Sequence, residues 1–147
     1  MFKRIGYWTD DTFEFDRLIT IHPKYLVDHN WEVARRSKIV CYLKSGVCAL
    51  EELGCSYCRF EDGPPDREMG CVELSDGVYI WPEGLAIYIE RYHIRLPDEF
   101  IRHMAENNFT IPKDLDAKAI KRRCQDEPSD FESWKTWCKI EMERIAQ

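Results

Sequence analysis

The sequence lacks the features by which membrane proteins, secreted proteins and several enzyme classes are recognised. No stretch approaches the roughly 18–20 consecutive apolar residues of a membrane-spanning helix, and the opening residues MFKRIGYWTDDTFEF contain no apolar core typical of a secretory signal. The motifs G-x-S-x-G, G-x-G-x-x-G, H-E-x-x-H and the P-loop are also missing. We therefore expect a cytoplasmic protein without a membrane segment, and we favour a non-enzymatic role.

Composition and charge indicate the state of the cysteines, the kind of partner and the number of domains. The seven cysteines are odd in number, and in a reducing cytoplasm we expect free thiols. With 21 Lys and Arg against 27 Asp and Glu, the net charge is −6, so a phosphate backbone is not the expected partner. The chain has 147 residues, 44% hydrophobic and 13% aromatic, which predicts a single domain with a well-filled core.

Residue patterns predict a helix and then a small sheet. Short strand-like pieces occur near Phe13–Phe15 and Leu18–Ile21, and apolar residues at helical spacing predict a helix over residues 31–45. The following runs VCALEEL, SYCRF, GCVELS and VYIW are strand-like. Asp76-Gly77 separates the last two and indicates a hairpin, because both residues tolerate positive φ. The prediction is a small antiparallel sheet over residues 47–81, packed by several helices on one side.

The stretch Trp81-Pro82-Glu83-Gly84 raises the question of a catalytic loop. Proline is suited to the first turn of a helix, and a glutamate there complements the helix dipole. Apolar residues then recur at helical spacing to residue 93, and Pro97 starts a second helix in the same way. We therefore interpret the stretch as a joint that turns a strand into a helix.

The C-terminal residues 112–147 predict a helical extension packed on the same α+β domain. A short helix is expected over residues 114–123, and Ser129 or Asp130 is suited to cap a last helix that ends near Ala146. Apolar residues make a stripe on this last helix: Phe131, Trp134, Cys138, Met142 and Ile145, with Trp137 beside them. Such a stripe either packs on its own domain or forms a partner interface.

One pattern resembles a known group of sequences. It reads D-G-x-x-x-W-P-E-G-L followed by R-L-P-x-E-F, and here comprises Asp76, Gly77, Trp81–Leu85, Arg95–Pro97, Glu99 and Phe100, with the aromatic Tyr88 between its halves. With it, residues 38–104 resemble a group of bacterial proteins for which no activity is established. The group is expected to carry a histidine where this chain has Ile87. The resemblance supports the fold of this segment and implies no mechanism.

Cysteines raise the hypothesis of a zinc site. Cys55 and Cys58 have the C-x₂-C spacing that supplies two ligands of a tetrahedral zinc, and Cys71 is the nearest candidate for a third. No second C-x₂-C supplies a fourth ligand, and free cysteines are usually buried packing residues. A redox C-x-x-C normally lies at a helix N-terminus, which the strand-like surroundings do not predict. We expect no cofactor, with zinc as the alternative.

A binding face is expected where the hairpin meets the two proline-initiated helices. Its candidate residues are Tyr57, Arg59, Tyr79, Trp81, Glu83, Arg95 and Asp98. In a purely structural alternative, the two arginines pair with Glu83 and Asp98 and lock the joint.

Function is inferred mainly from what the sequence excludes. We expect a cytosolic bacterial interaction protein that binds another protein or itself, in an accessory, inhibitory or immunity-like role. The alternatives are a zinc-stabilised domain that contacts nucleic acid and an enzyme without a recognisable short motif.

Overall fold

The sheet at the centre of the protein has four strands. The computed structural model describes residues 1–9 and 20–147. Its strands are β1 (Lys3–Arg4), β2 (Val47–Glu51), β3 (Val72–Ser75) and β4 (Tyr79–Pro82), in the order β1-β4-β3-β2. β2, β3 and β4 are antiparallel as predicted, whereas β1 pairs parallel with β4. The sheet is therefore mixed, because the N-terminus supplies an edge strand that hairpin signals do not reveal.

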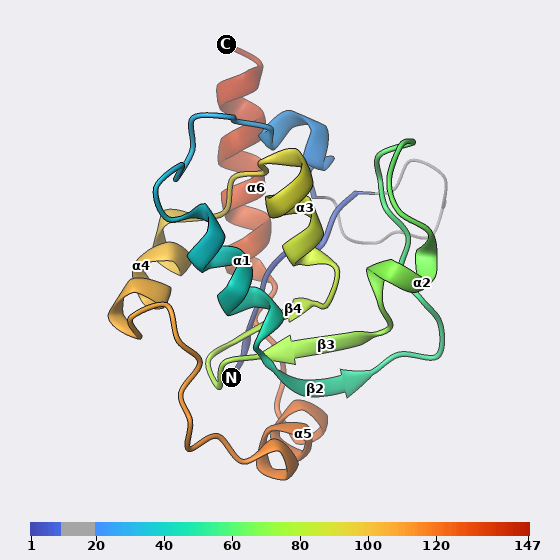
Figure 1. The fold of residues 1–147 in the computed structure, drawn as a ribbon, viewed down its shortest axis with the longest axis vertical. Coiled ribbons are helices and arrows are strands. Elements are labelled where there is room, and N and C mark those ends of the chain that lie inside the picture. Colours follow the sequence, from blue (N-terminus) through green and yellow to red (C-terminus); the bar gives the residue numbers. More distant parts are fainter. Residues whose placement is uncertain (10–19) are drawn as a thin grey trace.

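Helices cover both faces of this sheet. In the described part of the chain they are η1 (Pro23–Leu26), α1 (Arg36–Lys44), α2 (Asp66–Met69), α3 (Leu85–Tyr92), α4 (Asp98–Glu106), α5 (Ala117–Asp126) and α6 (Glu132–Ile145). Figure 1 shows α1, α3 and α4 on one side of the strands and α5 on the other. No helix among the described residues is both long and apolar enough to cross a membrane. The α+β prediction is confirmed, but the prediction that helices cover only one side of the sheet is wrong.

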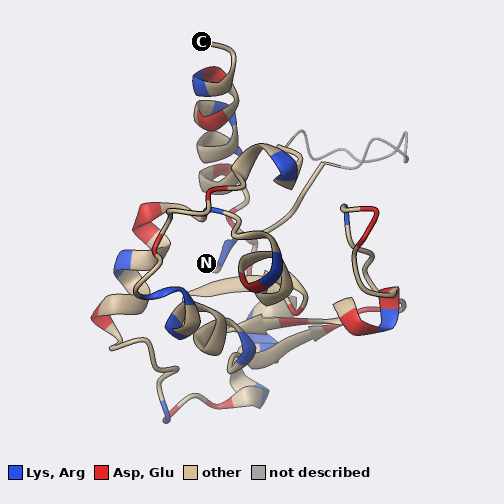
Figure 2. Cartoon of the chain, turned by 45° about the horizontal axis from the view of Figure 1, so that its top comes forward, with Lys and Arg blue, Asp and Glu red and all other residues tan. Residues whose placement is uncertain are grey.

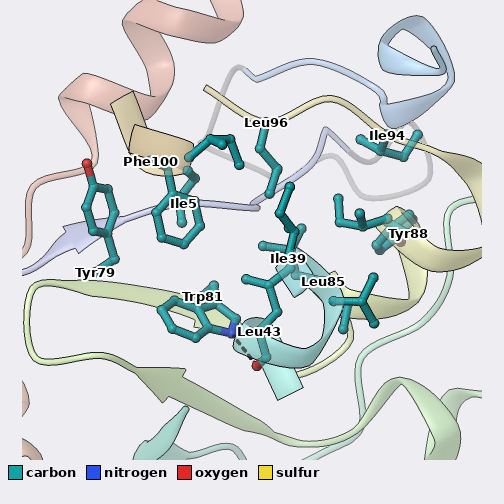
Figure 3. Close-up of a cluster of buried hydrophobic side chains, with 14 of the residues drawn as sticks. Ile5, Ile39, Leu43, Tyr79, Trp81, Leu85, Tyr88, Ile94, Leu96 and Phe100 are labelled. Atoms are coloured by element: carbon teal, nitrogen blue, oxygen red, sulfur yellow. Dashed lines mark hydrogen bonds between the residues drawn. The ribbon is translucent and has the colours of Figure 1, made fainter. Parts of the chain in front are cut away.

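Strand alternation explains why both faces are covered. Tyr79 and Trp81 point into the main core beneath α1, α3 and α4 (Figure 3). Ile80 points the opposite way and packs with Phe2 and with Ile120 of α5. The C-terminal extension therefore completes a second, smaller core.

Some predicted elements differ from those observed. The run SYCRF is not a strand, because the N–H of Arg59 donates to the Tyr88 hydroxyl (3.0 Å) instead of a neighbouring strand. Residues 31–35 form turns before α1, and Glu32 has a φ of 49° that interrupts a helix. The predicted strand at 13–15 lies outside the described residues. Of the one at 18–21, only Thr20 and Ile21 are described, and neither is in a strand.

Asp76 joins the hairpin to two helices. Its side chain is fully buried, and Oδ1 accepts the N–H groups of Val78 (2.9 Å) and Tyr79 (2.7 Å). Oδ2 accepts the hydroxyl of Tyr42 in α1 (2.6 Å) and lies 3.0 Å from Nε2 of His103 in α4. The hairpin is confirmed, but within its turn only the glycine has positive φ (94°), so the predicted turn conformation is wrong.

Three residues of the joint between β4 and α3 make specific contacts, whereas Pro82 is the last residue of β4 and α3 begins only at Leu85, so the prediction of a proline in the first helical turn is wrong. Trp81 is fully buried and donates Nε1–H to the Leu43 carbonyl (3.0 Å). The Glu83 carboxylate accepts the N–H groups of Cys71 (3.2 Å) and Val72 (3.3 Å). At Gly84, an added Cβ would lie 2.8 Å from the carbonyl oxygen of Met69. The stretch therefore connects strand to helix through close contacts with α1, with the end of α2 and with the start of β3.

Gly70 is expected to be indispensable to this joint. Its φ is +83°, and an added Cβ would lie 2.1 Å from Glu83 Oε2. Gly70→Ala should therefore lower the free energy of unfolding by about 1–3 kcal/mol, measured by urea denaturation. Gly54→Ala is the control, because nothing lies within 4 Å of its added Cβ; the expected change is within about 0.5 kcal/mol. Equal losses in both variants would contradict this account of Gly70.

Candidate functional site

Two cavities bring together the side chains able to bind a ligand. The first, here called the tryptophan cavity, has a volume of about 330 Å³ and lies between β1, residues 95–99 and α6. Its walls include Trp31, Trp134, Trp137, Tyr79 and Ile140, and its polar residues include Arg95, Glu141 and Arg144. This combination of aromatic walls and a few polar groups is typical of binding sites.

A buried carboxylate forms the polar centre of the tryptophan cavity. The side chain of Glu141 is only 4% exposed, and its Oε2 accepts from Nη2 of Arg95 at 2.9 Å. Its Oε1 accepts from Nη1 of Arg144 at 3.2 Å. Each oxygen therefore has a cationic donor, which offsets the cost of burying the charge.

The aromatic walls are held in place by specific contacts. Trp134 and Trp137 stack with ring centroids 5.2 Å apart, and Trp134 Nε1–H donates to the Tyr7 carbonyl (2.8 Å). Tyr79 lies beneath Lys3, whose Nζ is 5.7 Å from the ring centroid. Burial, followed by the charge of Glu99, raises the pKa of Tyr79 above its ordinary value. Tyr79 therefore remains a neutral phenol at physiological pH.

The second cavity, here called the glycine cleft, has a volume of about 470 Å³. Gly6, Gly54, Gly70 and Gly84 line it, together with Trp8, Arg59, Glu83, Tyr88, Cys55 and Cys71. Among the described residues, the buried Nε1 of Trp8 and Nε of Arg59 have no hydrogen-bond partner. Burial raises the pKa of Tyr88 to about 12. Two unpaired donors beside a neutral phenol suit a ligand that carries hydrogen-bond acceptors.

One ion pair separates the two cavities. Arg4 lines the tryptophan cavity, Glu73 lines the glycine cleft, and Nη1 of Arg4 donates to Oε2 of Glu73 at 2.5 Å. Tyr7 donates its hydroxyl to the other carboxylate oxygen. Burial and then the Glu73 charge raise the pKa of Tyr7 well above its ordinary value.

The predicted binding residues do not gather in one place. Arg59 and Glu83 line the glycine cleft, whereas Tyr79, Arg95 and Asp98 line the tryptophan cavity. Trp81 is buried in the core, and Tyr57 stacks on the Arg59 guanidinium at 4.2 Å. The predicted residues are therefore divided between two cavities and the core instead of lining one cavity.

The predicted pairing of the two arginines with Glu83 and Asp98 is also not formed among the described residues. Arg95 reaches across to Glu141 of α6, and Arg59 donates Nη1–H to the Tyr57 carbonyl (2.9 Å). Arg95 therefore fixes the position of α6, which local sequence spacing could not indicate.

The proposed zinc ligands are not assembled. No three His, Cys, Asp or Glu side chains in residues 1–9 and 20–147 are grouped as a metal site. Cys55 and Cys71 both line the glycine cleft, whereas Cys58 lies near Tyr88 and packs against Gly63. The C-x₂-C spacing does not bring a metal site together here, because Cys55 lies beside Cys71 whereas Cys58 packs against Gly63.

Sequence reasoning missed Trp31 and Glu141 as cavity residues. A signal for Glu141 existed: it lies seven residues after Trp134 and three after Cys138, so all three share one helix face. A carboxylate on a buried stripe needs a cationic partner. For Trp31, which lies in a turn, no such periodic signal exists.

Comparison of the chain with known protein families, with curated proteins and with solved structures finds no match. The resemblance to the bacterial group remains a prediction, and the candidate site rests on its geometry.

Replacing each arginine partner of Glu141 tests the polar centre. Arg95 is 23% exposed, and its removal leaves half of a buried carboxylate without a donor. Arg95→Ala should lower the free energy of unfolding by about 3 kcal/mol, measured by urea denaturation. Arg144 is 69% exposed, and Arg144→Ala should cost at most about 1 kcal/mol. A smaller loss for Arg95→Ala than for Arg144→Ala would contradict this account.

A histidine pair predicts a pH dependence of stability. Nδ1 of His29 lies 2.7 Å from Nδ1 of His93, so one nitrogen must be an unprotonated acceptor. Burial, followed by Arg36 and His29, lowers the pKa of His93 below 6.5. Between that lowered pKa and 6.5 the unfolded chain binds more protons, so stability falls as pH decreases through this window.

The variant His93→Asn isolates this effect. Asparagine tolerates the left-handed conformation at this position (φ 56°) and does not titrate. Thermal melting between pH 7.5 and 5 should show a smaller loss of stability in the variant than in the wild type. Identical pH profiles would rule out a contribution of His93.

Proposed function

We propose that the chain is a non-catalytic cytosolic protein that binds a partner protein through the tryptophan cavity. The supporting observation is the combination of side chains there: Trp31, Trp137, Tyr79, Arg95 and Arg144 converge on one cavity. Tryptophan, tyrosine and arginine are the residues that contribute most energy at protein interfaces. An accessory or inhibitory role agrees with such a site.

The surface beside the cavity extends this argument. Ile140 lines the cavity and is 45% exposed, and Met142 and Ile145 are each 46% exposed. They lie on the C-terminal half of α6, which extends beyond the body of the protein (Figure 1). The predicted packing of the apolar stripe therefore holds for Trp134 and Cys138 but not for Met142 and Ile145. Exposed apolar side chains next to an aromatic cavity favour a partner protein.

The charge distribution favours a protein over a nucleic acid. The net charge is −6, and Figure 2 shows basic and acidic residues interspersed over the helices. A binder of the phosphate backbone needs a concentrated positive surface. Self-association through the same surface is included in the proposal, because a second copy is also a protein partner.

Photocrosslinking tests this proposal. In cells that naturally express the chain, a photoreactive phenylalanine analogue at position 140 should crosslink to one discrete protein on illumination. The same analogue at Leu53, which is fully exposed outside the tryptophan cavity, should not give that product. Adding Trp137→Ala should reduce the product at least tenfold, since loss of a central interface aromatic typically costs about 2 kcal/mol.

Two results would overturn the proposal. One is the absence of any protein crosslink at position 140, and the other is an equal yield at position 53. A thermal melt of each variant shows whether the fold is retained, so that loss of the crosslink is not mistaken for unfolding.

A further inference from the structure

Two cysteines meet at the rim of the glycine cleft. Beyond the paired strands β2 and β3, the chain segments 52–56 and 70–71 stay together: the N–H of Glu52 donates to the Cys71 carbonyl at 2.7 Å, and that of Ser56 to the Gly70 carbonyl at 2.9 Å. These two hydrogen bonds bring Cys55 close to Cys71, and the Cys55 thiol is near enough to contribute to the raised pKa of the Cys71 thiol. Both residues are exposed.

The neighbouring cysteine does not compete for this contact. Cys58 is only three residues from Cys55, but it is partly buried and lies near Tyr88. An added Cβ on Gly63 would lie 2.4 Å from its Sγ, so the thiol packs tightly beneath that turn. The pairing suggested by C-x₂-C spacing is therefore replaced by one between residues 16 positions apart.

We propose that Cys55 and Cys71 are a reversible oxidation site that forms an intramolecular disulfide with a low-molecular-weight disulfide as oxidant. One thiolate attacks a sulfur of the reagent and releases one reagent thiol. The second cysteine thiolate attacks the resulting mixed disulfide, closes the protein disulfide and releases the other reagent thiol. The protein loses two electrons and two protons, and the reagent is reduced to two thiols.

The fold provides both access and alignment. The glycine cleft opens beside the two thiols, and no atom lies within 4 Å of an added Cβ on Gly54, so a small reagent can approach. The backbone hydrogen bonds between residues 52–56 and 70–71 hold the second thiol next to the mixed disulfide. Formation of the intramolecular disulfide is therefore favoured over attack by a second external thiol. The new bond would tie the cleft wall at residues 52–56 to Cys71, whose N–H is held by Glu83.

The reaction should accelerate as pH rises. Desolvation, then the Cys55 thiol and the Glu83 carboxylate, raise the pKa of the Cys71 thiol above 9.0. Only the thiolate attacks a disulfide, so closure should be slower at pH 7 than at pH 9.

Titration of the reduced full chain with oxidised glutathione tests the pair. In wild type and in the matched control Cys58→Ser, the peptides that contain residues 55 and 71 should lose both of their free thiols and together the mass of two hydrogen atoms. Fragmentation of unreduced peptides should join residues 55 and 71. In Cys55→Ser and Cys71→Ser, the remaining cysteine of the pair should instead keep a glutathione adduct. Dithiothreitol should restore both thiols in the wild type.

Two outcomes would overturn the proposal. If Cys71→Ser still closes a disulfide and Cys58→Ser does not, the reactive pair is Cys55 with Cys58. If the wild type forms only glutathione adducts over the whole titration, the two thiols are in contact without being an oxidation site. Thermal melting of the serine variants, all at surface or partly exposed positions, confirms that each is folded.

Discussion

A carboxylate without solvent exposure is costly to bury unless its oxygens are hydrogen-bonded, and Asp76 satisfies this condition with groups from three parts of the chain. Two backbone N–H groups come from its own hairpin, a hydroxyl comes from α1 through Tyr42, and an imidazole comes from α4 through His103. The β3–β4 hairpin, α1 and α4 are therefore positioned relative to one another by a single side chain. The main core around Trp81 forms between these elements.

The two cavities adjoin where β1 and β3 contribute an ion pair. β1 brings Arg4 beside Glu73, and this pair is the wall between the tryptophan cavity and the glycine cleft. Glu73 lies opposite Pro82, and at this same end of the sheet the β4–α3 joint uses Glu83 to hold the backbone at Cys71. The same joint therefore supports the fold and places the Cys55–Cys71 thiol pair at the rim of the cleft.

The two proposals depend on different parts of the molecule. Partner binding rests on α6, where Glu141 pairs with Arg95 and the helix end exposes apolar residues. Oxidation rests on the segments 52–56 and 70–71. The Arg4–Glu73 pair lies between the two cavities, with Arg4 lining one and Glu73 lining the other.

The sequence by itself determined the α+β class, the strands β2, β3 and β4, and the helices that begin after Trp81-Pro82-Glu83-Gly84 and at Pro97. These features are predictable because hydrophobic periodicity, proline and glycine act on the backbone over only a few residues. Tertiary structure alone decided the rest. The parallel strand β1, the Arg95–Glu141 pair and the Cys55–Cys71 contact join residues far apart in the chain, and which distant partners meet depends on the packing of the whole domain. The C-x₂-C spacing was misleading for the same reason. Two cysteines at the spacing of zinc ligands bind a metal only if the folded backbone brings their thiols together.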